Sequence, residues 1–188
     1  CNSGSSFSSG RETTARVAAG AVAAKILKEL GIEVHAYTKA IGPVSVPENE
    51  YHPEEIFQNP IYMPSNAYAK KASAYLEECI KNQDSSGGII ECVVTGMPTG
   101  IGDTVFEKLD ANLAKAMLSI GAVKGFEIGD GFKAADAKGS INNDSFHTKD
   151  GRITKDTNHA GGVLGGISDG SKIIFRAAVK PTPSISQP

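Results

Sequence analysis

The run Ser9-Gly10-Arg11-Glu12-Thr13 has the residue types and spacing of an anion site at the start of a helix. The Ser9 side chain can accept a hydrogen bond from the Glu12 N–H, and Glu12 can reach back to the N–H of Ser9. A helix start gathers unpaired N–H donors at the positive end of the helix dipole, and Arg11 adds a guanidinium there. This combination suits a phosphate or a carboxylate. Taken alone, the run is better explained as an ordinary helix cap with a surface arginine.

Four further segments place glycines or a lysine beside predicted strands. They are residues 119–125, 128–132, 160–166 and 180–182. Glycine lets backbone amides approach a flat or phosphorylated ligand, and lysine supplies a point charge for phosphate. Each segment by itself is explained by a turn. None is a nucleotide fingerprint, because Gly129-Asp130-Gly131 lacks a third glycine and the loop 96–102 lacks a following lysine and hydroxyl.

Titratable side chains give a weaker signal. His159 is the histidine in a suggestive place, just before a double glycine, but no acid or nucleophile pairs with it in the sequence. The three cysteines have no metal-ligand spacing, and Cys79 and Cys92 fit small core residues of a helix and a strand. We therefore predict no metal site and no nucleophilic cysteine.

Hydrophobic periodicity predicts the elements that must position these residues. Helices are expected at 11–30, 66–82 and 106–120, a short helical segment at 132–137, and strands at 32–40, 89–94, 123–128 and 172–179. An apolar face on the first helix includes Val22, Ile26 and Leu30, and Gly31 is expected to end that helix. Residues 139–159 are polar and predict a mobile surface loop. The mixture indicates α/β or α+β layers.

Bulk composition restricts the function classes. The 188 residues fit a single domain, 1–188, with globular contents of 40% hydrophobic and 21% charged residues. A net charge of −2 gives no case for nucleic acid or an anionic membrane as partner. Sparse cysteines and the absence of a membrane-span or signal-peptide pattern in these residues indicate a cytoplasmic protein. Both ends of the chain look like cuts through a larger protein.

Taken together, the motifs resemble the chorismate synthase family. The resemblance rests on five motifs in the family's order along nearly the whole chain. They are the helix opening 9–13 with 17 and 20–22, the loop 96–103 with 106–111 and 116–120, and the segments 123–132, 157–168 and 180–185.

The resemblance implies a lyase of the shikimate pathway of aromatic amino acid biosynthesis. Such an enzyme converts 5-enolpyruvylshikimate 3-phosphate to chorismate by an anti-1,4-elimination of phosphate and depends on reduced FMN. The implied fold is α+β, with a helical layer sandwiched between antiparallel β-sheets, and the enzyme is usually a homotetramer. Some members also reduce their flavin with NADPH. A reduced flavin suits the reaction because loss of an allylic phosphate develops charge that an electron-rich ring stabilises.

Residue by residue, the resemblance implies that Ser9 and Arg11 bind the substrate's phosphate or carboxylate. It implies flavin contacts at Ser8, Ser9, Gly121, Ala122, Gly165, Lys180, Pro181, Thr182, Pro183 and Ser184. Several of these are the glycines and the lysine that stand out on physical grounds.

The chain also departs from the family pattern. Phe7 stands where many members carry a basic residue, and Ser6 stands where glycine or glutamate is usual. The chain resembles the central half of the enzyme. The family's two proton-handling histidine segments and its C-terminal arginine/aspartate motif have no match in it, so we assign no catalytic residue. We predict that these 188 residues alone show no turnover and at most weak flavin affinity. The alternatives are a catalytically inactive flavin- or phosphate-binding module and a purely structural fragment.

Overall fold

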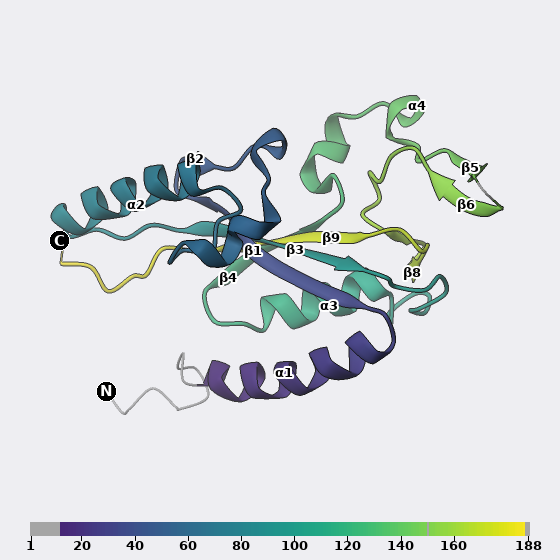
Figure 1. The fold of residues 1–188 in the computed structure, drawn as a ribbon, viewed down its shortest axis with the longest axis horizontal. Coiled ribbons are helices and arrows are strands. Elements are labelled where there is room, and N and C mark those ends of the chain that lie inside the picture. Colours follow the sequence, from purple (N-terminus) through teal and green to yellow (C-terminus); the bar gives the residue numbers. More distant parts are fainter. Residues whose placement is uncertain (1–11, 150, 187–188) are drawn as a thin grey trace. The chain divides into compact units, whose positions relative to one another are not determined.

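The structure, a computed structural model, describes residues 12–149 and 151–186 (Figure 1). Its helices are α1 (Thr13–Glu29), α2 (Asn66–Lys81), α3 (Leu109–Leu118) and α4 (Gly139–Asn142), with 3-10 segments η3 (Glu48–Glu50), η4 (Pro53–Gln58) and η5 (Gly131–Asp136). Its strands are β1 (Glu33–Ile41), β2 (Val44–Ser45), β3 (Gly88–Thr95), β4 (Val123–Ile128), β5 (Phe146–Lys149), β6 (Arg152–Lys155), β7 (Val163–Leu164), β8 (Ile167–Ser168) and β9 (Ile173–Val179).

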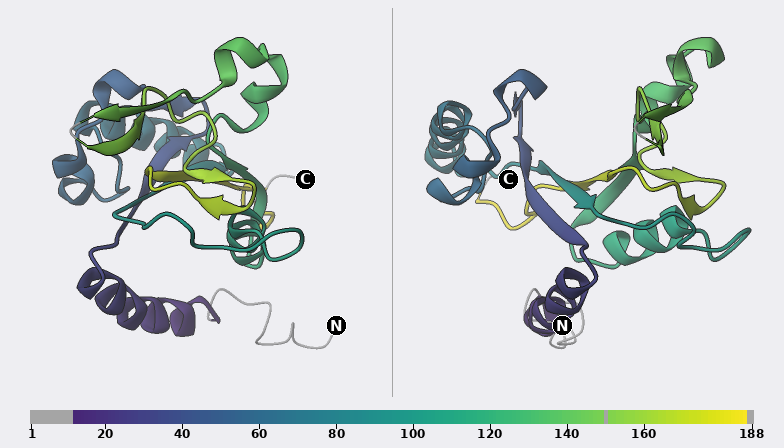
Figure 2. Two further views of the ribbon diagram at one scale, coloured as in Figure 1. Left: turned by 90° about the vertical axis from the view of Figure 1, so that its right-hand side faces the viewer. Right: turned by 45° about the vertical axis from the view of Figure 1, so that its right-hand side comes forward.

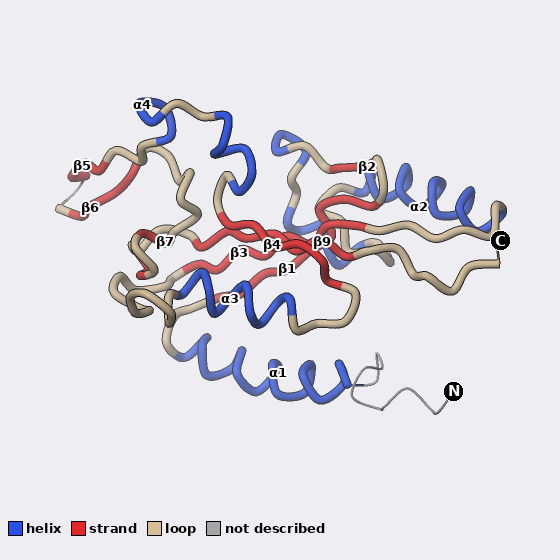
Figure 3. Tube along the Cα trace, turned by 180° about the vertical axis from the view of Figure 1, so that it is seen from behind, coloured by secondary structure: helices blue, strands red, loops and turns tan. Residues whose placement is uncertain are grey.

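One five-stranded sheet has the order β2-β1-β3-β9-β4, drawn in red in Figure 3, and two small sheets pair β5 with β6 and β7 with β8. The printed pairs β1–β2, β5–β6 and β7–β8 are antiparallel. Helices together with antiparallel pairs confirm the predicted α+β class. The helical layer between two sheets stays a prediction.

The described residues divide into two compact units. Unit 1 holds residues from 12–35, 93–121 and 126–175, and unit 2 holds residues from 36–92, 122–125 and 176–186. Four boundaries fall inside β1, β3, β4 and β9, and a fifth falls between residues 121 and 122, just before β4.

In unit 2, the core lies where α2 packs on β2 (Figure 2). Ser65 caps α2 by accepting a hydrogen bond from the Tyr68 N–H, which satisfies one of the free donors at the helix start. The cap fixes the direction in which the helix leaves the preceding segment. The core cluster that results consists of Val46, Met63, Ala69 and Ala72.

In unit 1, Gly31 ends α1 as the sequence predicts. Its φ of +76° is left-handed, its N–H donates to Lys28, and the N–H of Ile32 donates to Leu27. The apolar face of this helix is exposed in the described residues, with Val22, Ile26 and Leu30 at 62%, 59% and 67% exposure. Helical periodicity records which residues share a face and does not say whether that face is covered.

Two expectations need correction. Residues 139–159, expected as a mobile surface loop, contain α4 and the hairpin β5–β6, in which Phe146 pairs with Lys155, and their mobility stays a prediction. The third helix begins at Leu109 and not near 106. The hairpin β5–β6 is short and exposed and needs little apolar surface, so its polar composition resembles that of a loop.

Candidate functional site

The glycine strap, residues 157–168 of unit 1, packs backbone to backbone against the loop that follows β4. The N–H of Asp130 donates to the His159 carbonyl at 2.8 Å. A Cβ on Gly129 would lie 2.0 Å from that same carbonyl oxygen, and a Cβ on Gly161 would lie 2.3 Å from the Gly129 nitrogen. Only glycine fits at either position, so the two glycine segments that the sequence shows separately form one interlocked pair of loops.

The far end of the strap is the β7–β8 hairpin. Val163 pairs with Ser168, and Gly165 and Gly166 make the turn with φ of +60° and +92°. Nothing lies within 4 Å of a Cβ built on Gly165, so its face is open. The buried Ser168 hydroxyl donates to the Pro98 carbonyl at 2.6 Å, which ties the strap to the loop 96–102.

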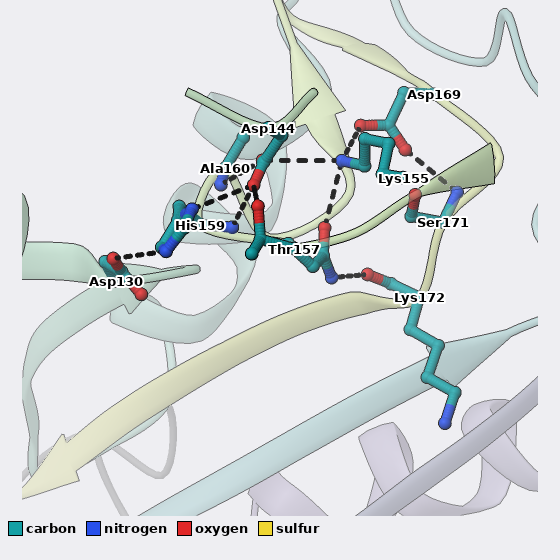
Figure 4. A network of polar contacts seen from close by, with 10 residues as sticks. Asp130, Asp144, Lys155, Thr157, His159, Ala160, Asp169, Ser171 and Lys172 are labelled. Atoms are coloured by element: carbon teal, nitrogen blue, oxygen red, sulfur yellow. Dashed lines mark hydrogen bonds and ion pairs between the residues drawn. The ribbon is translucent and has the colours of Figure 1, made fainter. Parts of the chain in front are cut away.

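A buried carboxylate, Asp144, holds the start of the strap. Its Oδ1 accepts from the Thr157 hydroxyl at 2.7 Å, from the His159 N–H at 2.8 Å and from His159 Nδ1 at 3.0 Å. Its Oδ2 accepts from the Ala160 N–H at 3.0 Å. Figure 4 shows these donors converging on one side chain.

Lys155 supplies the counter-charge. Its ammonium lies between Asp169, at 2.7 Å, and Asp144, at 3.5 Å, and donates to Asn158 Oδ1 at 3.2 Å (Figure 4). The side chains of Lys155, Asp144 and Asp169 are only 3%, 4% and 7% exposed. Charges buried this far require paired partners, and here the three groups satisfy one another.

The carboxyl groups of this network are acidic. Burial raises the pKa of Asp144, but the hydrogen bonds from Ala160, Thr157 and His159 and the charge of Lys155 outweigh burial and hold that pKa well below its usual range. Burial likewise raises the pKa of Asp169, but the hydrogen bonds from Lys155 and Ser171 outweigh burial and lower that pKa below its usual value. Both groups are therefore carboxylates at neutral pH.

Two carboxylates that are distant from His159 in the sequence, Asp144 and Asp130, lie close to its imidazole ring. An ionised Asp144 can only accept, so Nδ1 of His159 carries the hydrogen of their 3.0 Å contact. Nε2 of His159 lies 4.0 Å from Asp130 Oδ2. The imidazole is thus oriented by a buried carboxylate on one side and faces a partly exposed one on the other.

In unit 2, Ala122 and Lys180 come together. The Lys180 N–H donates to the Ala122 carbonyl at 2.9 Å, and Ala122 has the left-handed φ of +69° that is costly for a residue with a Cβ. The exposed tail beyond Lys180 is held by Ser85, whose hydroxyl donates to the Thr182 carbonyl at 2.7 Å. Strain at a non-glycine residue is typical of functional turns.

The predicted anion site at the start of α1 lies mostly outside the described residues, since Ser8, Ser9 and Arg11 all do. Within the described part, the Glu12 carboxylate pairs with Arg16 at 3.0 Å. Arg16 also donates to the Ser119 hydroxyl at 2.8 Å, two residues before Gly121. The capping box between Ser9 and Glu12 stays a prediction.

The comparison with family models decides the relationship. The chorismate synthase family model matches residues 2–188. The chain belongs to the chorismate synthase family. It is 61% identical over 183 residues to a chorismate synthase of Agathobacter rectalis and 60% identical over 185 residues to one of Lachnoclostridium phytofermentans. These alignments cover 97% and 98% of this chain and 50% of each relative, so the chain spans about half the length of the curated relatives it matches.

The fold agrees with that membership. A crystal structure of a chorismate synthase superposes with a TM-score of 0.86 at 33% identity, covering 93% of this chain and 57% of the other. Within the described residues, no helix is both long and apolar enough to cross a membrane.

The motifs of the sequence do not predict one buried network of charged residues, but they do predict the position of Cys92. Asp144 and Lys155 of the buried network lie in the segment 139–159 that the sequence predicts to be a polar loop, and Asp169 directly follows the glycine strap. The signal that the sequence offers for this network is the charge of these residues close to the glycine motif. The interpretation of Cys92 as a core residue is supported, because burial raises the pKa of its thiol to about 11.

The low pKa of Asp144 leads us to expect that the free energy of unfolding decreases in acid. Because its folded pKa is depressed, its contribution to the free energy of unfolding is fully present above the unfolded pKa of about 3.9 and is lost as pH falls through the folded pKa. Denaturant unfolding between about pH 5 and about pH 3 should show a steeper decline for wild type than for Asp144→Asn. Asp169, shifted in the same direction, maintains a residual slope in the variant. Parallel curves for the two proteins would contradict this assignment.

Proposed function

We propose that this chain works in a chorismate synthase, which eliminates phosphate from 5-enolpyruvylshikimate 3-phosphate to give chorismate. The observation that carries the proposal is the family match over residues 2–188, together with relatives at 60% identity that bear this name. The reaction is a carbon–oxygen lyase step of the shikimate pathway. The second candidate function is a flavin- or phosphate-binding module without turnover, which a measurement of chorismate formation distinguishes from the enzyme.

Reduced FMN is the cofactor we propose, and when bound it supplies an electron-rich ring that stabilises charge developing as the allylic phosphate leaves. The residues proposed to contact it are Ser8, Ser9, Gly121, Ala122, Gly165 and Lys180 to Ser184. Observations on the described residues fit such a ligand. Gly165 presents an open face, Ala122 holds a strained turn beside Lys180, and the exposed tail is anchored at Thr182.

For the substrate, we propose that Arg11 and Ser9 bind the phosphate or the carboxylate. A guanidinium can make a bidentate pair with either anion, and a serine hydroxyl can donate to the same oxygens. This contact would hold the leaving group while its negative charge develops. We further propose a cytoplasmic homotetramer, with NADPH as a flavin reductant.

A chimera tests the function. This chain would replace the matched half of the Agathobacter rectalis enzyme, which is 61% identical to it, and chorismate formation would be measured with supplied reduced FMN. We expect turnover in the chimera and none in the isolated 188 residues. Arg11→Ala in the chimera should lower turnover by about 100-fold, since it removes a donor to the leaving phosphate. Lys25→Ala, which removes an exposed cation from α1, is the control.

The outcomes separate the candidates. A chimera that binds FMN but forms no chorismate would favour the inactive module. Turnover in the isolated chain at the level of the parent enzyme would contradict our expectation that segments outside it supply the proton-handling histidines. An Arg11→Ala chimera as active as its Lys25→Ala control would remove Arg11 from the substrate site.

A further inference from the structure

The glycine strap needs an external anchor because its own residues do not define its shape. Gly161, Gly162, Gly165 and Gly166 all have φ between +60° and +92°. Glycine visits this region and its mirror image with similar ease, so such a segment loses much conformational freedom when it is fixed. A binding loop with this composition is preorganised only if neighbouring groups hold it.

Asp144 is the group that holds it at its start. The carboxylate receives two consecutive backbone N–H groups, those of His159 and Ala160, and both precede the first glycine of the strap. It also receives the Thr157 hydroxyl, so three successive attachment points lie within four residues. Backbone N–H donors fixed by one carboxylate orient the peptide planes and with them the direction in which the chain enters Gly161.

Lys155 and Asp169 hold Asp144 in turn. The Lys155 ammonium bridges the two carboxylates and donates to Asn158, whose own amide donates to the Lys172 carbonyl at 2.8 Å. The bridge therefore attaches the hairpin β5–β6, whose last residue is Lys155, to both sides of the strap. Because the ammonium offers three hydrogens and has three acceptors, no donor on it is left over.

We propose that Asp144 is a positioning residue for ligand binding by the glycine strap, fixing through the N–H groups of His159 and Ala160 the conformation in which Gly165 meets its ligand. The identity of that ligand as FMN rests on the proposed function. The fixing of the strap does not, since it follows from contacts within unit 1. Asp144 itself touches no reacting group and acts through the backbone that it holds.

Hydrogen exchange and flavin titration together test the proposal. Asp144→Asn keeps an acceptor for Thr157 and His159 but turns an amide toward Ala160 and Lys155, whereas Asp144→Ala removes every acceptor. The exchange rate of the Ala160 amide should rise by at least about tenfold in Asp144→Asn, and the rates of both the His159 and Ala160 amides should rise by at least that factor in Asp144→Ala, because hydrogen bonds to a charged group contribute that much. In the chimera, the Kd for FMN, followed by flavin fluorescence, should rise by at least about tenfold in Asp144→Asn and by more in Asp144→Ala.

Two controls keep the test specific. The Val46 amide, bonded to the Lys39 carbonyl in the core of unit 2, reports whether the fold survives and should keep its exchange rate. Asp136→Asn removes one exposed carboxylate from η5 and should leave both readouts unchanged. A graded loss in the order Asn, then Ala, with Val46 unaffected, distinguishes positioning from general unfolding.

Other results overturn the proposal. Unchanged exchange at Ala160 in Asp144→Asn, or at His159 and Ala160 in Asp144→Ala, would show that the carboxylate does not hold the strap. Faster exchange with an unchanged Kd for FMN would show that the fixed strap does not matter for binding. If the wild-type chain and the chimera bind no FMN at millimolar concentration, the flavin assignment fails and takes the ligand part of this proposal with it, while the exchange data still decide whether Asp144 fixes the strap.

Discussion

Replacing Gly129 with alanine is expected to destabilise the chain by about 2–5 kcal/mol, the sum of overpacking and a left-handed alanine. The methyl group would lie 2.0 Å from the His159 carbonyl oxygen and 2.6 Å from the Gly161 nitrogen. Both obstacles are backbone, so no side chain can swing away. Unfolding by urea, followed by circular dichroism, measures the change in free energy.

Gly165→Ala is the matched control for that variant. Its φ of +60° is nearly the same as the +56° of Gly129, but nothing lies within 4 Å of the added carbon. The cost should be the left-handed conformation alone, about 1–2 kcal/mol. Equal losses of stability in the two variants would show that the backbone contact between the loops is not as close as described. Because the new methyl at Gly165 touches no protein atom, a weaker affinity for FMN in this folded variant would report on the ligand.

Local patterns predicted the elements whose causes are local. The left-handed Gly31 ends α1, and β1, β3, β4 and β9 lie within a few residues of the alternating or apolar runs that predicted them. The sequence also predicts which apolar residues of α1 share a face. It does not predict that this face is exposed, since coverage of a helix face depends on residues far away in the chain.

The candidate site divides in the same way. The sequence shows Gly129-Asp130-Gly131 and the strap as separate glycine motifs, but their interlocking is a contact between distant segments that no spacing rule predicts. The sequence offers no acid partner for His159, because Asp144 lies 15 residues away in the chain. The hairpin between them is polar in composition, so the sequence predicts a loop there. The family resemblance supplied the flavin and substrate roles of individual residues, which periodicity and composition could not.

Glu91 is a buried carboxylate whose burial the sequence does not predict, because the residues around it form an apolar strand pattern. It lies in the middle of β3, in the run that predicted an apolar buried strand. Its Oε1 accepts a short hydrogen bond from the Tyr37 hydroxyl, and its Oε2 accepts from Arg176 at 3.1 Å. Burial, followed by the hydrogen bond to Glu91 and its charge, raises the pKa of Tyr37 far above its usual value, so the phenol remains a donor. All three residues lie in unit 2.

Removing the Arg176 guanidinium should therefore destabilise the chain strongly. Arg176→Met leaves a carboxylate of which only 10% of the side chain is exposed without its nearby positive charge. Breaking a fully buried pair costs about 3–5 kcal/mol, and the 21% exposure of the Arg176 side chain reduces the expectation to about 2–3 kcal/mol. The free energy of unfolding in urea at neutral pH measures it.

A double-mutant cycle separates the pair from everything else that Arg176 contacts. Glu91→Gln keeps an acceptor for Tyr37 and removes the charge that Arg176 neutralises, so Arg176→Met should cost less in the Glu91→Gln background than in wild type. The difference between the two costs is the coupling of the pair, and we expect at least about 1 kcal/mol because both groups are largely withdrawn from water. An identical cost in both backgrounds would mean that Arg176 stabilises β9 through its packed stem and not through Glu91. The Glu91 carboxylate would then be stabilised mainly by the hydrogen bond from the neutral Tyr37 hydroxyl.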